Sequence, residues 1–360
     1  MSAGWEEARN ILCVRLDNMG DVLMTTPAIR ALRESVPGRR LTLLASASGV
    51  ALAPYLDCVD DAIGYAAPWV KQASSSTPEA DRDMMAALAT HQFDAAVVFT
   101  VYSQSPLPAA LMCRLAGIPR VLAHCRENPY ALLTDWIPET EPHERIRHEA
   151  QRQLDLVAHV GATTADRRLV FDPGDDARLR MRDVLCRTGI DAGTPYIVLH
   201  PGATAPSRIY PADSFATVAR MLLREFEGHV LLTGTEDETA RAEALRRAIG
   251  HPRVHGLAGL LDLGALGALL EDARVLIANN SGPVHLAAAV GTPVVDLYAL
   301  TNPQHTPWMV PNRVLFRDVP CKYCYRSVCP AGHHACLAGI APGEVVEATR
   351  AVWRREAAPC

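Results

Sequence analysis

Residues 11–35 read ILCVRLDNMGDVLMTTPAIRALRES, an apolar run that leads through a short polar loop into a helical pattern. The run at 11–16 has the composition of a strand buried on both faces, and residues 22–35 repeat apolar side chains at helical spacing. The same alternation of a short strand and a longer helix recurs along the chain. It predicts an α/β fold of doubly wound parallel sheets covered by helices.

The other elements expected from this pattern follow in order. Strands are predicted at 41–45, 95–99, 196–200, 230–233, 275–278 and 293–298, and helices at 84–90, 148–160, 177–188, 214–227, 238–249, 263–271 and 284–290. The alternation is interrupted between 161 and 195, so a domain boundary is expected near 163–175. The prediction is therefore two Rossmann-like domains, 1–165 and 166–340, that face a cleft, where ligands of such sheets bind. A Ser-rich loop is expected at 71–78.

Composition narrows the class of protein. The chain has 360 residues, 49% hydrophobic and 21% charged, which is enough apolar material for two cores. The net charge of −5 argues against a partner bound through a nucleic-acid backbone. The N-terminus lacks the pattern of a signal peptide, and no apolar run approaches the ~20 residues that span a bilayer. The protein is expected in the cytoplasm, with at most peripheral contact at the inner face of the membrane.

The first candidate for chemistry is the loop RLDNMGD, residues 15–21, after the first predicted strand. Gly20 is expected to adopt a backbone conformation closed to other residues and to let a ligand approach the chain. Asp21 is either a helix N-cap or a general base that accepts a proton from an acceptor hydroxyl. Asp17 is a weaker candidate on the same loop.

The second candidate is HPGATAPSRIYP, residues 200–211, which follows another predicted strand. Its small residues expose backbone N–H groups, and the guanidinium of Arg208 suits phosphate oxygens. Thr204 and Ser207 add hydroxyl donors. A surface turn with a solvated arginine is the alternative. The phosphate interpretation is favoured because the loop lies at the carboxyl end of a strand.

The third candidate is NNSGPVHLAAAVGTP, residues 279–293. Ser281 is the expected N-cap, and Pro283 suits the first helical position. The free N–H groups and dipole at such a helix start favour an anion. His285 is either structural or a donor to a phosphate or a sugar. The chain has no G-x-G-x-x-G after a strand, no G-x-x-x-x-G-K-[ST] and no G-x-S-x-G, which disfavours dehydrogenases, P-loop enzymes and α/β-hydrolases.

The chain has ten cysteines, and four of them lie together in CKYCYRSVCPAGHHAC, residues 321–336. Four thiolates from Cys321, Cys324, Cys329 and Cys336 could close a structural zinc or iron site. Reduced thiols and disulfides are the alternatives, and the cytosolic setting disfavours disulfides. Four sulfur ligands leave no open position, so a catalytic metal is not expected. The six scattered cysteines are expected to be reduced, the internal ones buried.

Three blocks carry a resemblance to a known family: RLDNMGDVLMTTPAIRALRE at 15–34, HPGATAPSRIYPADSFATVA at 200–219, and LIANNSGPVHLAAAVGTPVVDLYALTNPQHTPW at 276–308. They resemble, in order and spacing, the blocks of glycosyltransferase family 9. The resemblance implies a GT-B fold, with the acceptor bound mainly by the first domain and the donor by the second. A last helix, near 344–355 in the segment 341–360, would pack back toward the first domain. The resemblance also implies inverting transfer of a heptose from ADP-heptose to a lipopolysaccharide-type glycan, glycolipid or related protein acceptor, with no cofactor required for catalysis.

The resemblance assigns roles to particular residues. Asp21 matches the general base, and Arg208, where many members have Lys, would stabilise the departing diphosphate. Asn280 stands where many members have Asp, which bears on the donor sugar. The donor-binding set implied by the resemblance is Gly20, Thr204, Ser207, Leu261, Asn280, Ser281, Gly282, Pro283 and His285. Clustered cysteines also occur in part of the wider family, where they suit a metal.

Two alternatives remain open from sequence. The chain could be a non-catalytic subunit that binds a nucleotide sugar, an interpretation that Asn280 supports and Asp21 opposes. It could also be a family member that uses another donor, or that acts on a capsule, a protein or a secondary metabolite. The loops at 71–78 and 100–108, where the acceptor is expected, carry no readable code for its identity.

Overall fold

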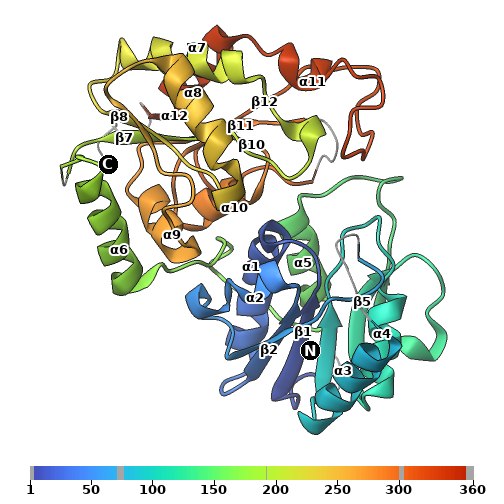
Figure 1. Ribbon diagram of the computed structural model, residues 1–360. Helices are drawn as coiled ribbons and strands as arrows, with labels where there is room; N and C mark the ends of the chain where they lie inside the picture. The colour runs from blue at the N-terminus through green and yellow to red at the C-terminus, as the bar shows by residue number, and fades with distance from the viewer. Residues whose placement is uncertain (1–3, 71–76, 192, 300–303, 354–360) are drawn as a thin grey trace. The chain divides into compact units, whose positions relative to one another are not determined.

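The structure is a computed structural model that describes residues 4–70, 77–191, 193–299 and 304–353. The chain divides into two compact units, Met1–Val170 and Phe171–Cys360, and the division lies inside the predicted 163–175 stretch. Each unit is built on a six-stranded parallel sheet, as the strand–helix alternation predicts (Figure 1). The assignment of an acceptor role to the first unit and a donor role to the second stays a prediction.

The sheet of the first unit has the strand order β3-β2-β1-β4-β5-β6. Its two central strands, β1 and β4, pair in parallel from Ile11 opposite Ala95 to Val14 opposite Val98. Helices α1 and α5 pack against each other, and α3 packs against α4 (Figure 1). The elements are β1 (Asn10–Arg15), α1 (Met19–Ser35), β2 (Arg40–Ala45), α2 (Ala47–Val50), β3 (Asp61–Gly64), α3 (Pro78–Thr90), β4 (Ala95–Val98), α4 (Leu107–Leu115), β5 (Val121–Cys125), β6 (Asp135–Pro138) and α5 (Glu149–Ala158).

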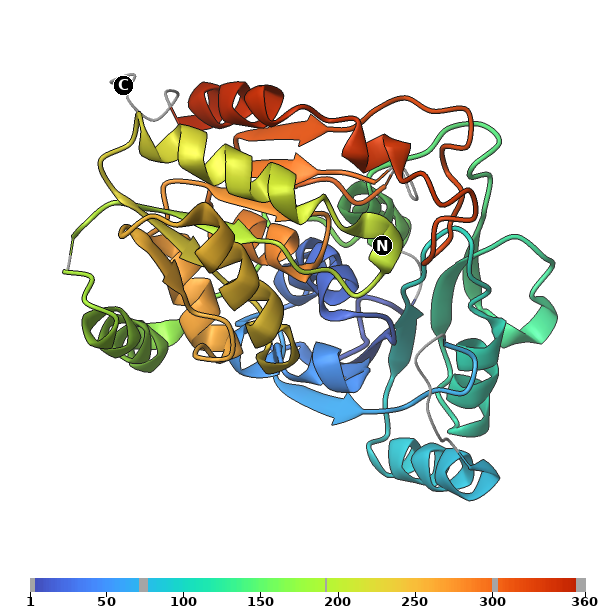
Figure 2. The same ribbon diagram turned by 45° about the horizontal axis from the view of Figure 1, so that its top comes forward.

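The sheet of the second unit has the order β12-β11-β10-β7-β8-β9. Helix α7 packs against both α8 and α12, and α9 packs against α6 and α10; Figure 2 shows α12, in red, beside α7, in yellow. The elements are α6 (Gly174–Arg187), β7 (Tyr196–His200), α7 (Ala212–Leu223), β8 (His229–Leu232), α8 (Thr239–Ile249), β9 (Val254–Gly256), α9 (Leu263–Glu271), β10 (Leu276–Asn279), α10 (Gly282–Ala289), β11 (Val294–Leu297), β12 (Asn312–Leu315), α11 (Ala335–Ala338) and α12 (Pro342–Trp353).

Local sequence explains where several helices begin and end. The Asp262 side chain accepts a hydrogen bond of 2.7 Å from the Ala265 N–H and so caps α9, and Thr77 caps α3 in the same way. Helix α8 ends at Gly250, whose φ of 64° is the left-handed conformation that glycine adopts without steric cost. The strands β4, β7, β10 and β11 are buried along their whole length, as expected of parallel strands covered on both faces.

Helix α12 closes the described part of the chain. It packs against α7, β11 and β12 of its own unit, and its buried face includes Val345, Val346 and Val352. The predicted packing of this segment toward the first domain stays a prediction, and its last residues, 354–360, lie outside the described residues. The Ser-rich loop predicted at 71–78 also falls mostly outside them, at 71–76. None of the helices among the described residues combines the length and the hydropathy of a membrane span.

Candidate functional site

A largely buried cluster of four charged side chains lies around the carboxyl end of β1. The guanidinium of Arg15, fully buried, lies 3.0 Å from Asp17, 3.3 Å from Asp21 and 2.8 Å from Glu149. Burial alone would lower the pKa of Arg15, but the three carboxylates raise it above its ordinary value. Arg15 therefore stays protonated, and its single positive charge is shared by three carboxylates from two segments of the unit.

The candidate base, Asp21, lies inside α1 and not at its N-cap. The helix begins at Met19 with Asn18 as its N-cap, and Asp21 is the third helical residue. One oxygen of Asp21 accepts a hydrogen bond of 3.2 Å from the Asn18 N–H, which completes a capping box, and the other faces Arg15. Asp21 is therefore not the N-cap, as one alternative predicted, although it stabilises the start of the helix through the capping box. It also forms an ion pair with Arg15.

The expected backbone conformation of Gly20 was wrong, and its place in the donor-binding set stays a prediction. Gly20 is the second residue of α1 and has helical backbone, so it does not use the left-handed region that only glycine enters freely. Asp17 is a member of the Arg15 cluster and also accepts a hydrogen bond of 2.6 Å from Gln104. Burial raises the pKa of Asp17, and the nearby Arg15 counteracts this shift. Sequence reasoning gave no role to Arg15 or Glu149, although Arg15 is the first residue of the quoted loop.

In the second unit, the two predicted phosphate loops leave neighbouring strands. The loop 200–211 follows β7 and the loop 279–293 follows β10, and these two strands pair in the centre of the sheet. The strand order reverses between β7 and β10, which is the position where sheets of this kind bind ligands at their carboxyl ends. The topology therefore brings together two segments that are about 80 residues apart in sequence.

Asn279, which sequence reasoning overlooked, ties the two loops together. Its side-chain oxygen accepts a hydrogen bond of 2.9 Å from the Tyr210 N–H, and its side-chain nitrogen donates to the Pro201 carbonyl at 2.8 Å. The same loop passes close to Glu238, because a Cβ at Gly202 would lie 2.0 Å from its carboxylate. The loop 200–211 is thus held at both its strand end and its helix end.

Ser281 is the N-cap of α10, as predicted, but its hydroxyl does not cap the helix. It donates instead to the Asn279 carbonyl at 3.0 Å. The helix begins at Gly282, so Pro283 is its second residue and not its first. His285 is buried one turn into the helix, with its ring edge-on to that of His305. An α10 start without a side-chain cap suits an anion.

Arg208 lies in a short 3-10 helix, Pro206–Arg208, and is partly buried. It acts electrostatically on Asp296, a fully buried carboxyl group at the end of β11. Burial raises the pKa of Asp296 well above its ordinary value, and the hydrogen bond from Asn280 and the charge of Arg208 oppose that shift. The Asn280 side chain donates to Asp296 at 3.0 Å and to the His305 carbonyl at 2.7 Å. Asn280 and Arg208 therefore share one acidic neighbour.

The remaining donor-site candidates differ in exposure. Thr204 is exposed on the loop, and Leu261 is partly buried just before the N-cap of α9. Ser207 is 4% exposed, and its hydroxyl donates to the Arg326 carbonyl. The Ser207 hydroxyl therefore points to the cysteine-rich segment. A hydroxyl that donates to a ligand phosphate would have to point to the ligand instead.

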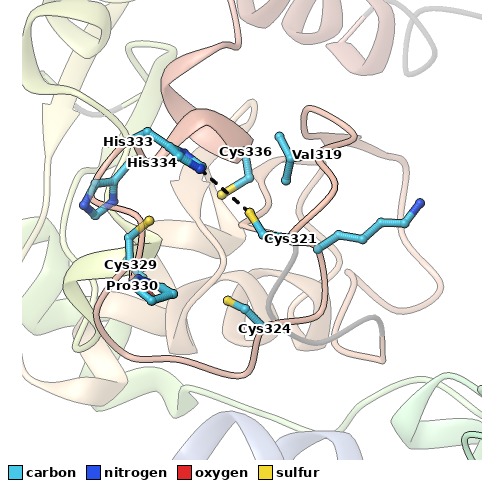
Figure 3. Close-up of a pocket in the computed structure, with 10 residues that line it drawn as sticks. Val319, Cys321, Cys324, Cys329, Pro330, His333, His334 and Cys336 are labelled. Carbon is cyan, nitrogen blue, oxygen red and sulfur yellow. Dashed lines mark hydrogen bonds between the residues drawn. The ribbon is translucent and has the colours of Figure 1, made fainter.

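The four clustered cysteines line one small cavity. Cys321, Cys324, Cys329 and Cys336 are free thiols around a cavity of about 20 Å³, together with Ser207 and His333. Figure 3 shows the four sulfur atoms pointing toward the same space, with His333 close to Cys321. Backbone N–H groups, first that of His334, lower the pKa of the Cys329 thiol. In residues 304–353, as in the rest of the described chain, no group of three or more His, Cys, Asp or Glu side chains is assembled for a metal ion.

The other cysteines follow the prediction with one exception. Cys13, Cys58, Cys113 and Cys125 are buried and free, and burial raises the pKa of both Cys58 and Cys113 to about 12. Cys186 is exposed near the end of α6, so the expectation that all internal cysteines are buried was wrong there. Cys360 lies outside the described residues.

Comparisons with known proteins agree with this architecture. A family model described as glycosyltransferase family 9 (heptosyltransferase) matches residues 82–335. Lipopolysaccharide heptosyltransferase 3 of Escherichia coli K12 is 23% identical over 293 residues, which cover 80% of this chain and 81% of that protein. The solved structure of E. coli ADP-heptose lipopolysaccharide heptosyltransferase II has a TM-score of 0.76 at 22% identity, over 97% of this chain and 100% of that one.

A second solved structure is similar at lower identity. The iron-containing dodecameric glycosyltransferase TibC of enterotoxigenic E. coli H10407 has a TM-score of 0.55 at 14% identity, over 98% of this chain and 77% of that one. It has also been solved in complex with ADP-D-β-D-heptose. The solved structures share the GT-B fold of two parallel α/β sheets that is seen here. The family model spans more than half of the chain, and the protein therefore belongs to glycosyltransferase family 9.

Proposed function

We propose that this glycosyltransferase transfers a heptose from ADP-heptose to a hydroxyl group of a glycan of the lipopolysaccharide type. The observation that carries the proposal is that Asn279, just before the uncapped start of α10, forms hydrogen bonds to both ends of the loop that holds Arg208. A partly buried guanidinium and an uncapped helix start are both groups that suit a diphosphate. Relatives that bind ADP-heptose or carry heptosyltransferase names support the choice of donor.

The proposed reaction is a single displacement. The acceptor oxygen forms a bond to the anomeric carbon of the donor, and the bond from that carbon to the diphosphate oxygen breaks with its electron pair. Asp21 takes the hydroxyl proton, while Arg15 and the Asn18 N–H hold its carboxylate in place. In the second unit, Arg208 and the N–H groups at Ser281–Gly282 stabilise the negative charge that develops on the diphosphate. The anomeric centre is inverted, because one displacement occurs.

For the cysteine cluster, we propose a structural metal held by Cys321, Cys324, Cys329 and Cys336. Support comes from the four sulfur atoms that face one cavity and from the backbone N–H groups that stabilise the Cys329 thiolate. Four thiolates suit zinc or iron, and they leave no open position for catalysis. The metal would fix the segment that contacts Ser207, and no step of the transfer passes through it.

A donor screen tests the function directly. The purified chain would be titrated by calorimetry with ADP-heptose and with GDP-, UDP- and dTDP-sugars, and ADP release would then be followed with lipopolysaccharide cores of increasing length. Selective binding of ADP-heptose with transfer to one core is the expected result. Selective binding of another nucleotide sugar would reject the heptose donor, and binding without transfer to any core would make the chain a binding subunit.

A further inference from the structure

Asn280 and Asp296 lie next to each other on paired strands of the second sheet. Strands β10 and β11 pair in parallel, with Ala278 opposite Asp296, and Asn280 directly follows the last residue of β10. The Asn280 N–H donates to the Leu297 carbonyl at 3.2 Å, so its backbone continues the pairing for one more residue. Asn280 is therefore held at the carboxyl end of the sheet, directly before Ser281, the N-cap of α10.

The amide group of the Asn280 side chain is held in one orientation. Its nitrogen donates to the Asp296 carboxyl group at 3.0 Å and to the His305 carbonyl at 2.7 Å. A backbone carbonyl can only accept, and a carboxyl group keeps an accepting oxygen in either protonation state. If the amide were reversed, its oxygen would face the His305 carbonyl oxygen, and a buried hydrogen bond would be lost. The nitrogen therefore faces the protein.

This orientation decides what a ligand can meet at Asn280. Both hydrogens of the side-chain nitrogen are used inside the protein, so the side-chain oxygen is the group through which Asn280 can bind a ligand. Asn280 is 5% exposed, so its side chain is already ordered and largely desolvated before a ligand arrives. A fixed acceptor of this kind matches a hydroxyl group, which donates a hydrogen bond.

Asp296 is fully buried inside β11, so its carboxyl group is not open to a ligand. It can act on the site through its hydrogen bond with Asn280 or through its electrostatic effect on Arg208. We propose that Asp296 is a positioning residue, which holds the Asn280 amide so that the Asn280 oxygen accepts a hydrogen bond from a hydroxyl group of the nucleotide sugar. This inference rests on the proposed transferase function and adds to it a residue that contacts no ligand itself.

A double-mutant cycle on the two residues tests this proposal. Asn280→Ala is expected to weaken ADP-heptose binding roughly fivefold or more, because it removes the acceptor, and Asp296→Leu should weaken it by a similar factor, because the amide is no longer held. The double variant should bind within ~2-fold of Asn280→Ala, since Asp296 then has no amide to hold. Calorimetric titration measures all four proteins with ADP and with ADP-heptose. A loss with both ligands places the hydroxyl on the nucleotide, and a loss with ADP-heptose alone places it on the sugar.

Two further variants separate the hydrogen bond from charge and from stability. Asp296→Asn removes the negative charge near Arg208 but keeps an accepting oxygen, so its affinity should stay within ~2-fold of the wild type. Tyr196→Phe is the structural control, because it removes a buried hydrogen bond of 2.9 Å to the Leu269 carbonyl from the start of β7, at the amino end of the same sheet. It should lower the stability and leave the affinity for both ligands unchanged.

A second measurement tests the orientation in the wild type, without any Asp296 variant. Nitrogen-15 spectra of protein labelled at asparagine contain the side-chain signals of Asn280, which are assigned by their loss in Asn280→Ala. Both hydrogens are bonded to buried acceptors, so they should exchange slowly with solvent, before and after ADP-heptose is added. Rapid exchange in the wild type would overturn the proposed orientation.

The binding results separate this inference from the proposed function. Wild-type affinity in Asp296→Leu, additive losses in the double variant, or equal losses in Asp296→Asn and Asp296→Leu would reject the positioning role of Asp296 and leave the nucleotide-sugar donor standing. If the wild type binds neither ADP nor ADP-heptose, the proposed donor is rejected, and the role of Asp296 in binding it is rejected with it.

Discussion

The hydroxyl of Ser207 donates a hydrogen bond of 2.7 Å to the backbone carbonyl of Arg326, and the Ser207 N–H donates to the Ser327 carbonyl at 3.0 Å. Ser207 immediately precedes Arg208, and Arg326 lies between two of the clustered cysteines. The two hydrogen bonds therefore connect the loop that carries the proposed diphosphate anchor to the segment that carries the proposed metal. Ser207 is better described as a residue that positions this loop than as a direct ligand donor.

Removal of the Ser207 hydroxyl should leave Arg208 less firmly positioned and so weaken ADP binding. Ser207→Ala is expected to weaken ADP binding by roughly fivefold, in line with the ~1 kcal/mol that one such hydrogen bond contributes. Ser207→Thr keeps a hydroxyl and should restore part of the affinity. Calorimetric titration with ADP measures both variants. Wild-type affinity in Ser207→Ala would mean that the contact to Arg326 does not position Arg208.

Substitution of Arg208 should weaken ADP binding more than substitution of Ser207. Arg208→Ala is expected to weaken ADP binding at least ~10-fold, because charge-assisted hydrogen bonds to phosphate contribute more than neutral ones. Arg208→Lys keeps the charge but not the planar fork, so it should fall between the alanine variant and the wild type. The control is Arg224→Ala, which removes the same charge from an exposed position of the same unit. Equal ADP affinity in the two alanine variants would remove Arg208 from the donor site.

The buried carboxyl group of Asp296 should make stability depend on pH. Burial raises its pKa above the ordinary value, so the folded protein holds a proton that the unfolded chain has lost. Its contribution to stability is full below the unfolded pKa of about 4 and is lost as the pH rises through the folded value, at up to ~1.4 kcal/mol for each pH unit.

The measurement that checks this effect compares urea unfolding of the wild type and Asp296→Asn at several pH values from 4 to 8. The stability of the variant relative to the wild type should increase as the pH rises. Asp272→Asn, an exposed site, should show no such trend. A difference between wild type and Asp296→Asn that stays constant over this range would show that the Asp296 carboxyl group is not protonated preferentially in the folded state.

The cysteine cluster predicts a bound metal in the isolated protein. Elemental analysis of protein purified without chelator should find about one zinc or iron ion for each chain, as four thiolates hold one ion. Cys329→Ser should lower the metal content and the melting temperature, whereas Cys186→Ser, at an exposed cysteine outside the cluster, should change neither. If the metal content of the wild type is zero, or equals that of Cys329→Ser, the thiols have another role.

Sequence pattern predicts the centre of each sheet better than its edges. The central strands β1, β4, β7, β10 and β11 are apolar on both faces and stand out as buried runs. The pattern did not predict the edge strands, because each is partly exposed and carries polar residues or glycine; these are β3, β6, β9 and β12. An edge strand packs on only one neighbour, so its sequence need not be uniformly apolar. The interior strand β5 is buried along its whole length but was also not predicted, because His124 interrupts its apolar run.

In the candidate site, too, some residues could be predicted from the sequence and others could not. Asp21, Arg208 and Ser281 all lie within a few residues after the end of a strand, and this position in the sequence was enough to single them out. The partners of these residues come from distant segments: Glu149 reaches Arg15 from α5, and Arg326 reaches Ser207 from the cysteine-rich segment. Such contacts depend on how helices and loops pack on the sheet, which no local pattern encodes.

The most direct test of the account concerns Asp21. ADP release from ADP-heptose would be followed with the lipopolysaccharide core that the wild type accepts, in parallel with the ADP affinity of each variant. Asp21→Asn keeps the shape of the side chain but cannot accept the proton, so turnover is expected to fall at least ~100-fold while ADP affinity stays at the wild-type value. Turnover close to that of the wild type would contradict the assignment of Asp21 as the base and, with it, the proposed mechanism.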